Sequence, residues 1–371
     1  MKRVDRLMKD AIVNRVFPGG VLLVSLDGNI VFYAAYGYAN IFSGRPMSPD
    51  TIFDLASLTK PLATTLAVMK LVSQQKLELD QHLGSILLQF KNTDKGQIKI
   101  EHLFYHNAGL PDYRPYYKSL CKLEPNLRKD ALRDFLVKEP LINPVGKQVL
   151  YSDLGFMILC WVIEQVSGER LDRFVTKEIY SPLGLENLFF VDLDSKPRKE
   201  KFAATERCPW RNIILDGAVH DDNAYVVGGI EGHAGLFGTA DDLYRLLSLL
   251  LSVFHGRSTS HLFKKELLQT FFKREDSTGR ALGFETPSLT ESSCGRYFSR
   301  ESVGHLGFTG TSFWMDLERS VIVILLTNRI HPSRDNNKIK AFRPKLHDTV
   351  MKNLPVAGSI KRTASKTLDL V

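Results

Sequence analysis

The sequence predicts an α/β fold of the α+β type, with one sheet built from both ends of the chain. Two pairs of strand-like segments support this prediction, one within residues 19–39 and one within residues 311–329. Each pair places β-branched and aromatic residues around a short polar turn, which is typical of a β-hairpin. The long stretch between the pairs has mainly helical patterns, so we expect the chain to leave the sheet and rejoin it.

Length and composition are those of an ordinary globular protein. The chain has 371 residues, of which 44% are hydrophobic and 24% charged, enough for one large domain with two lobes. We expect a single domain over residues 1–355, with an α/β lobe from about 1–75 and 235–355. A mainly helical lobe would cover about 76–234, and residues 356–371 would form a flexible tail.

The N-terminal segment predicts an amphipathic helix rather than a targeting sequence. Its apolar residues lie near helical spacing at Val4, Leu7, Met8, Ile12 and Val13. Asp5 and Asp10 interrupt it, so no apolar core of a secretory signal is present. No apolar run reaches the roughly 18–20 residues of a membrane span. We therefore expect a cytoplasmic protein, or a periplasmic one if an upstream signal is missing.

Four segments between the strand pairs have helical patterns, at residues 61–75, 126–139, 153–180 and 239–256. The first is apolar nearly all round, which predicts a buried helix. The third is divided at Gly168, and Asp153 is expected to cap its start. The fourth begins with a capping pattern from Thr239 to Asp242 and ends at Gly256.

Charge and motifs exclude several function classes. The net charge is +8, but the basic residues are dispersed among acids, so we expect solvated faces and no nucleic-acid partner. The four cysteines form no C-x-x-C pair, which argues against a zinc knuckle. His102 and His106 lack the glutamate of H-E-x-x-H, and they, His220 and His233 are expected to hydrogen-bond in turns. No phosphate-binding glycine loop is present, so we expect neither cofactor nor metal.

Ser57 and Lys60 carry the main chemical hypothesis. They are three positions apart, and Pro61 directly after the lysine marks the first turn of a helix. Both side chains would then share one face near the free N–H groups of the helix start. A serine becomes a nucleophile when such a base is beside it. The alternative is a surface serine that caps the helix, with a lysine extended along the surface.

Two further segments favour the catalytic interpretation. Tyr151 stands between an extended piece and an apolar helix. Glycines at positions 304, 307 and 310 lie in and before a strand, where they indicate close approach of backbone or ligand. His305 lies among them and is expected to make hydrogen bonds in a cleft.

These segments resemble the serine β-lactamase and penicillin-binding protein superfamily. Ser57-Leu58-Thr59-Lys60, Tyr151-Ser152-Asp153 and His305-Leu306-Gly307 occur in the order and broad spacing of its three motifs. The chain is most similar to the class C β-lactamase-like group, which includes DD-carboxypeptidases, D-aminopeptidases and esterases. The resemblance extends from about Val4 to about residue 353. It implies an antiparallel sheet flanked by helices.

The resemblance also implies the role of each motif residue. Ser57 would be the acylated nucleophile, Lys60 would shuttle its proton, and Tyr151 would act as general base and then acid. The backbone N–H groups of Ser57 and Phe308 would form the oxyanion hole. His305 and Gly307 would line the substrate side of the strand.

Two of the three motifs depart from the usual pattern. Asp153 replaces an asparagine, and an ionised carboxylate cannot donate a hydrogen bond to substrate but can pair with Lys60. His305 and Leu306 replace a lysine and a threonine, which weakens the grip on a substrate carboxylate.

The leading hypothesis is therefore a serine hydrolase that acts through an acyl-enzyme on acyl-D-amino-acid peptides, β-lactams or related amides. An esterase or D-aminopeptidase of the same family is the alternative. A weakly catalytic penicillin-binding or scaffold protein is the alternative from another class. The partner would be a small molecule or peptide, and the oligomeric state is left open.

Overall fold

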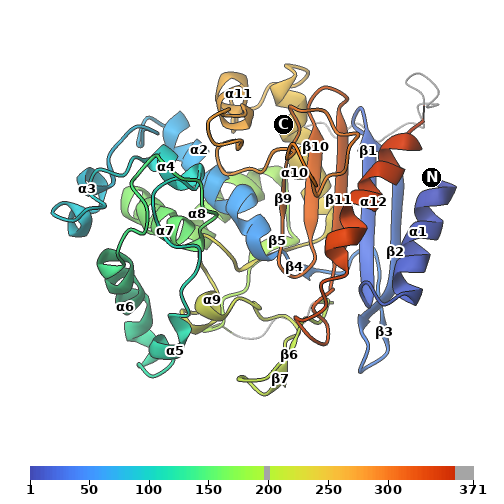
Figure 1. The fold of residues 1–371 in the computed structure, drawn as a ribbon, viewed down its shortest axis with the longest axis horizontal. Helices are drawn as coiled ribbons and strands as arrows, with labels where there is room; N and C mark the ends of the chain where they lie inside the picture. The colour runs from blue at the N-terminus through green and yellow to red at the C-terminus, as the bar shows by residue number, and fades with distance from the viewer. Residues whose placement is uncertain (196–200, 356–371) are drawn as a thin grey trace.

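The computed structural model describes residues 1–195 and 201–355, so the predicted tail at 356–371 lies outside the described residues. Its main element is an antiparallel six-stranded sheet in the order β3-β2-β1-β11-β10-β9 (Figure 1). Its strands are β1 (Gly19–Leu26), β2 (Asn29–Asn40), β3 (Arg45–Pro46), β9 (Val303–Leu306), β10 (Ser312–Asp316) and β11 (Val321–Thr327). Because β1 pairs with β11, the two ends of the chain share one sheet, as predicted.

The first hairpin follows from its turn residues. Asp27 and Gly28 both have positive φ angles, 48° and 74°, which is the requirement of a tight two-residue turn between twisted strands. Every residue of β1 is buried, because helices cover both faces of the sheet.

Helices α1 and α12 lie against the outer face, and α10 lies against the inner face (Figure 1). The helices are α1 (Lys2–Val13), α2 (Leu66–Ser73), α3 (Leu83–Ile86), α4 (Ile100–Phe104), α5 (Tyr117–Leu120), α6 (Pro125–Lys138), α7 (Asp153–Ser167), α8 (Leu171–Val175), α9 (Asp222–Val226), α10 (Ala240–Phe254), α11 (Lys265–Phe272) and α12 (Ile339–Lys352). In α1 the buried residues are Val4, Met8 and Ala11, while Val13 is 79% exposed. The expectation that Val13 belongs to the apolar face was wrong. The buried face follows the helical spacing from Val4 to Met8 and on to Ala11, and Val13 lies outside this line.

The segment between the strand pairs is mainly helical and surrounds the buried helix α7. Gly168 ends α7 in the left-handed conformation, as predicted. The cap at its other end is Ser152, whose side chain accepts from the N–H of Gly155, so the assignment of the cap to Asp153 was wrong by one residue. Asp153 is therefore free to direct its carboxylate elsewhere.

Short elements complete this part of the chain. Three 3₁₀ turns are η1 (Ala56–Leu58), η3 (Leu88–Phe90) and η5 (Ser181–Leu183), and two π-helical turns are η2 (Lys60–Thr65) and η4 (Thr176–Tyr180). A small three-stranded sheet has the order β4 (Phe53–Asp54), β8 (Leu236–Gly238) and β5 (Leu188–Phe190). A two-stranded sheet consists of β6 (Arg207–Cys208) and β7 (Ile213–Ile214).

One large apolar cluster includes residues of β1, α2, α7, α10 and β11. It therefore joins the sheet to the helical segment, whereas the division into two lobes near residues 75 and 235 stays a prediction. In the described parts of the chain, every helix is too short or too polar to traverse a bilayer.

Candidate active site

Ser57 is presented by a strained turn at the start of a buried helix. Ala56, directly before it, has a φ of 48°, which is an unfavourable backbone region for a residue other than glycine. The carboxylate of Asp54 stabilises this turn, because its Oδ1 accepts from the N–H of Ala56 at 2.9 Å. Ser57 then lies in η1, and the π-helical turn η2 with Pro61 near its start continues directly from it.

Lys60 lies beneath Ser57 and has no exposed side-chain surface. Its Nζ donates to Ser57 Oγ at 3.0 Å, to Asp153 Oδ1 at 2.7 Å and to the carbonyl oxygen of His233 at 3.3 Å. These three bonds use all three hydrogens of an ammonium group. The alternative of a serine and a lysine extended along the surface is therefore wrong.

The surroundings of Lys60 and Tyr151 favour a charged amine beside a neutral phenol. Burial opposes a charge on Lys60, but the Asp153 carboxylate outweighs it and the pKa of the amine is raised. Burial also raises the pKa of Tyr151, and the charge of Lys60 offsets part of this effect. The amine is 4.9 Å from the centroid of the Tyr151 ring, so the two groups titrate as a coupled pair.

A histidine and an arginine pack near the ring of Tyr151. His106 packs against it with 4.6 Å between ring centroids, and the guanidinium of Arg280 is 5.7 Å from its centroid. His106 Nδ1 also accepts from the N–H of Ser152 at 3.0 Å, which anchors the segment that carries Tyr151.

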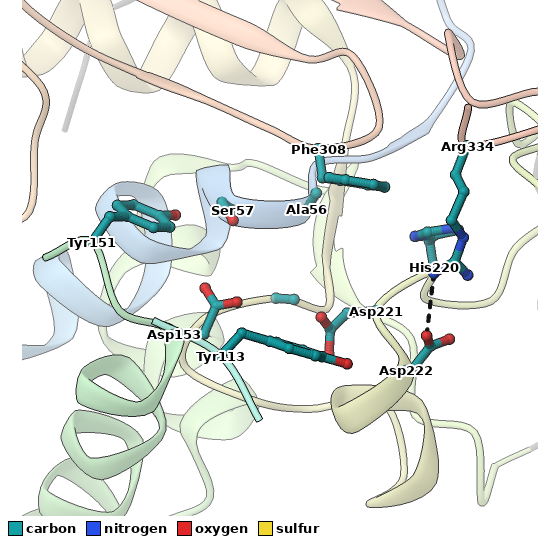
Figure 2. A pocket seen from close by; sticks show the side chains of 11 residues that line it. Ala56, Ser57, Tyr113, Tyr151, Asp153, His220, Asp221, Asp222, Phe308 and Arg334 are labelled. Atoms are coloured by element: carbon teal, nitrogen blue, oxygen red, sulfur yellow. Dashed lines mark hydrogen bonds and ion pairs between the residues drawn. The ribbon is translucent and has the colours of Figure 1, made fainter. Parts of the chain in front are cut away.

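Two cavities meet at this cluster and share Ser57, Tyr151 and Phe308. The first has a volume of about 380 Å³ and extends toward Asp221 and Arg334 (Figure 2). We call it the acidic cavity. Its lining consists of Ala56, Ser57, Tyr113, Tyr151, Asp153, His220, Asp221, Asp222, Ala234, Phe308 and Arg334.

The second cavity has a volume of about 270 Å³, and we call it the basic cavity. Its lining consists of Ser57, Tyr151, Glu285, Leu306, Gly307, Phe308, Arg329, Asn337, Ile339, Lys340 and Arg343. A substrate bound across both cavities would place its reacting bond at Ser57.

The predicted residues Gly307 and Phe308 follow β9 at the boundary between the cavities. A Cβ on Gly307 would be 2.0 Å from Thr311 Oγ1 and 2.6 Å from the carbonyl oxygen of Leu55, so glycine is required by close packing against the turn before Ser57. Phe308 is 50% exposed, and its backbone lies next to that same turn. The oxyanion hole formed by the N–H groups of Ser57 and Phe308 stays a prediction.

His305 lies differently from what the sequence indicated. It is 1% exposed and lines neither cavity, because its position in β9 directs it into the packed interior, where its ring centroid is 6.0 Å from that of Tyr151. Burial holds the pKa of His305 well below its usual range, and the nearby charges of Lys60 and Arg280 lower it further. The expectation that His305 lines the substrate side of the strand was wrong, and Leu306 is the residue of this strand that lines the basic cavity.

The expected hydrogen bonding within a turn is found for His102, whereas His220 and His233 pair with acids 14 and 12 residues away. His102 Nδ1 accepts from the N–H of Lys99, His220 Nε2 pairs with Glu206 at 3.1 Å, and His233 Nε2 pairs with Asp221 at 2.9 Å. Asp153, Asp221 and His233 bring three potential metal-ligating atoms within 4.8 Å of one another. Lys60 and His233 already neutralise these two carboxylates, so we place no metal there, and its absence stays a prediction.

Sequence reasoning missed Asp54, and the structure adds Tyr113 to the cavity lining. Asp54 is buried, and its Oδ2 accepts from the N–H of His220 at 2.7 Å, so one carboxylate links the Ser57 turn to the wall of the acidic cavity. Its place three residues before Ser57 gave no sign of this contact, which depends on a segment more than 160 residues away. Tyr113 lines the acidic cavity, whereas the neighbouring Tyr117 stacks on Trp210.

Comparison with known proteins agrees with this geometry. The family model described as Beta-lactamase matches residues 4–345. The chain is 34% identical to the N-acetylmuramyl-L-alanine amidase of Bacillus subtilis (strain 168), over 89% of this chain and 81% of that protein. It is 31% identical to the "Putative D-alanyl-D-alanine carboxypeptidase" of Escherichia coli (strain K12), over 91% of this chain and 84% of that protein.

Solved structures show the same architecture. EstCE1, a hydrolase with promiscuous acyltransferase activity, is similar with a TM-score of 0.71 and 25% identity, covering 92% of this chain and 98% of its own. The octameric penicillin-binding protein homologue from Pyrococcus abyssi has the same fold, with a TM-score of 0.72 and 20% identity over 95% of this chain and 77% of its own. The chain therefore belongs to the β-lactamase family and is a serine hydrolase of that family.

Proposed function

We propose that this protein is an amidase that cleaves its substrate through an acyl-enzyme on Ser57. The observation that carries the proposal is the bond between Ser57 Oγ and Lys60 Nζ, 3.0 Å long, at the junction of two cavities. A nucleophile in contact with a titratable base, with room for substrate on either side, is the arrangement that acyl transfer needs.

The proposed reaction begins with the coupled pair of Lys60 and Tyr151. Loss of one proton from this pair creates the base that takes the proton of Ser57. Ser57 Oγ then forms a bond to the amide carbonyl carbon, and the oxyanion is stabilised by the N–H groups of Ser57 and Phe308. The C–N bond breaks, and the pair returns the proton to the leaving amine. Water then attacks the acyl ester by the same route, which frees the acid and restores the Ser57 hydroxyl.

The substrate we favour is the amide between an N-acetylmuramyl group and L-alanine. The most similar of the relatives described above is named for this activity. A carboxypeptidase of this superfamily would hold the terminal carboxylate at the strand occupied here by His305 and Leu306. His305 is buried and neutral, and Leu306 has no hydroxyl, so this strand lacks both the cation and the donor. D-Ala-D-Ala peptides and β-lactams are therefore expected to be poorer substrates than muramyl amides.

The experiment compares purified wild type with Ser57→Ala on four probes. They are N-acetylmuramyl-L-alanyl-D-isoglutamine, a diacetyl-L-lysyl-D-Ala-D-Ala peptide, a fluorescent penicillin and p-nitrophenyl acetate. We expect wild type to release the dipeptide from the muramyl substrate and to react weakly with the penicillin, and both reactions to be lost in Ser57→Ala. The matched control is Ser119→Ala, on the exposed surface of α5, which keeps the wild-type rates.

Other outcomes would identify other functions. Faster cleavage of the D-Ala-D-Ala peptide would make the protein a carboxypeptidase, and ester hydrolysis alone would make it an esterase. A stable Ser57 adduct with no turnover would support a penicillin-binding protein. Activity that survives in Ser57→Ala would contradict the nucleophile assignment.

The compartment belongs to this proposal as well. In the cytoplasm the substrates would be soluble muramyl peptides, whereas in the periplasm intact peptidoglycan would also be accessible. Fractionation of cells that express the native gene, followed by antibody detection, separates these two cases.

A further inference from the structure

The acidic cavity contains three carboxylates, Asp153, Asp221 and Asp222, and its surroundings contain a fourth, Glu206. Such a cavity first indicates a cationic ligand, such as an amine. The internal partners of these groups argue against that interpretation. Four ion pairs account for the four acids, namely Lys60–Asp153 at 2.7 Å, His233–Asp221 at 2.9 Å, Arg211–Asp222 at 2.8 Å and Arg334–Glu206 at 2.6 Å.

These pairs leave the cavity balanced in charge. Burial opposes a charge on His233, but Asp221 outweighs it and raises the pKa of the imidazole, which favours the ionic form of this pair. Arg334 also contacts Asp222 at 3.3 Å, and this ion pair is drawn as a dashed line in Figure 2. A charged amine would gain little here, because each carboxylate already has a cationic neighbour. The fixed carboxylates still offer oxygen atoms that accept hydrogen bonds from neutral hydroxyl or amide groups.

Aromatic side chains form the walls of the same cavity. Figure 2 shows Phe308 on one side of the space and Tyr113 on the other, with Ser57 at one end. Tyr113 is 37% exposed, and its hydroxyl has no hydrogen-bond partner among the described residues. Phe308 packs against the ring of His220, with 5.6 Å between ring centroids, and the guanidinium of Arg329 is 4.6 Å from its centroid.

The geometry points to a pyranose-binding subsite in the acidic cavity, with the sugar ring between Tyr113 and Phe308 and its hydroxyl or acetamido groups directed toward Asp221 and Asp222. Apolar faces of a sugar pack on aromatic rings, while its hydroxyls need fixed polar partners, and this cavity supplies both without a net charge. The inference rests on the proposed amidase function and extends it. The glycosyl acyl half would occupy the acidic cavity, and the leaving amine the basic cavity.

The opposite half of the cleft is consistent with this orientation. Lys340 lines the basic cavity, is exposed and has no ion-pair partner among the described residues. Glu285 on the same wall is half-buried, its carboxylate is 3.9 Å from the guanidinium of Arg280, and burial raises its pKa. The basic cavity therefore offers a carboxylate of the leaving peptide one cation on helix α12, although strand β9 beside the reacting bond supplies none. The acidic cavity suits a group without charge.

The test measures binding without catalysis, on the full chain carrying Ser57→Ala. Isothermal titration with N-acetylmuramic acid gives the affinity, and saturation-transfer NMR identifies the ligand protons that contact the protein. We expect saturable binding with the strongest transfer to the pyranose ring protons. Tyr113→Leu in this background should weaken binding about tenfold, whereas Tyr113→Phe, which keeps the ring, should retain most of it.

Two controls complete the test. Melting temperatures of the Tyr113 variants show that the fold is intact. D-alanine amide serves as the cationic competitor, and tighter binding of this amine than of the sugar would overturn the inference, as would unchanged sugar binding in Tyr113→Leu. If sugar binding depends on Tyr113 but wild type cleaves no muramyl amide, the subsite stands and the proposed reaction is wrong. If muramyl amides are cleaved equally well by Tyr113→Leu, the reaction stands and the subsite is wrong.

Discussion

The carboxylate of Asp153 accepts a 2.7 Å hydrogen bond from Nζ of Lys60, a lysine with no exposed surface. The same Nζ is 3.0 Å from Ser57 Oγ. The protonation of the group that activates the nucleophile therefore depends on Asp153, a carboxylate at a position where the family motif usually has the amide of an asparagine. Because Asp153 raises the pKa of Lys60, it favours the protonated amine and delays formation of the base.

The first prediction is that Asp153→Asn shifts the pH dependence of catalysis. Removing the anion lowers the pKa of Lys60 and also that of Tyr151, which Asp153 raises. The acidic limb of the kcat profile should therefore move to lower pH by about one unit or more. Stopped-time assays with p-nitrophenyl acetate between pH 5 and pH 10 measure this shift. Asp130→Asn, on the exposed side of α6, is the control, and an unmoved limb in Asp153→Asn would contradict the role of the ion pair.

The second prediction separates charge from proton transfer at Lys60. Lys60→Arg keeps a cation beside Asp153, but a guanidinium does not release its proton at accessible pH. We expect a loss of about 1,000-fold in kcat with the acyl-enzyme no longer detectable by mass spectrometry. Lys95→Arg is matched to it, because Lys95 is also a buried lysine with an aspartate partner, Asp94 at 2.9 Å. Equal losses in both variants would indicate a general effect on the fold.

The third prediction concerns strand β9. A cation at position 305 would be buried beneath Tyr151, so His305→Lys should lower the free energy of unfolding by about 3 kcal/mol and leave substrate preference unchanged. Leu306→Lys places the cation in the basic cavity instead, and it should raise kcat/KM for carboxylate-bearing peptides relative to neutral esters. Urea unfolding and paired kinetic assays test both statements. Improved selectivity in His305→Lys would show that residue 305 does reach substrate.

The fourth prediction tests the packing of Gly307. An added methyl group would overlap Thr311 Oγ1 and the carbonyl oxygen of Leu55, so Gly307→Ala should cost about 2 kcal/mol and displace the turn before Ser57. The acylation rate should fall further than the loss of folded protein accounts for, because the displaced turn carries Ser57. Gly155→Ala is the control, because its new Cβ meets its nearest neighbour at an ordinary 3.5 Å within helix α7. Wild-type acylation rates in Gly307→Ala would contradict the close approach.

The fifth prediction is a loss of stability in acid through Glu206. Burial raises the pKa of this carboxyl, but His220 and Arg334 outweigh it and lower the pKa to about 2. The contribution of the Glu206 carboxylate to the free energy of unfolding is therefore complete above its pKa in the unfolded chain, near 4.5. This contribution is lost as the pH falls toward 2. Urea unfolding at several pH values should show a decrease of about 3 kcal/mol across this window that is absent in Glu206→Gln. A parallel decrease in both proteins would assign the acid sensitivity to other groups.

The sequence allowed the sheet and most long helices to be predicted because their patterns are local. The Asp27-Gly28 turn, the Thr239 cap and the end of α7 at Gly168 depend on neighbours within a few residues. Ser57 and Lys60 were also recognisable, since one helical turn brings them together. Their family motif then supplied Tyr151.

The rest of the site depends on contacts between distant segments. Two of the paired carboxylates of the acidic cavity, Asp221 and Asp222, lie at the start of α9, and Arg334, which pairs with Asp222, follows the last strand of the sheet. No spacing in the sequence indicates that these groups neutralise one another. The orientation of His305 was missed for a related reason, because period-two alternation in a short strand does not say which face is covered.

The meeting of two cavities at Ser57 has a consequence for the fate of the acyl group. Once the amine departs, the basic cavity is vacated while the acyl half still fills the acidic one. Water then competes for that vacancy with any other small nucleophile, such as an alcohol or a second amine. Whether the acyl group is hydrolysed or handed to another acceptor is thus decided by which molecule enters one side of the cleft first, and concentrated amine should divert the reaction from acid to a new amide.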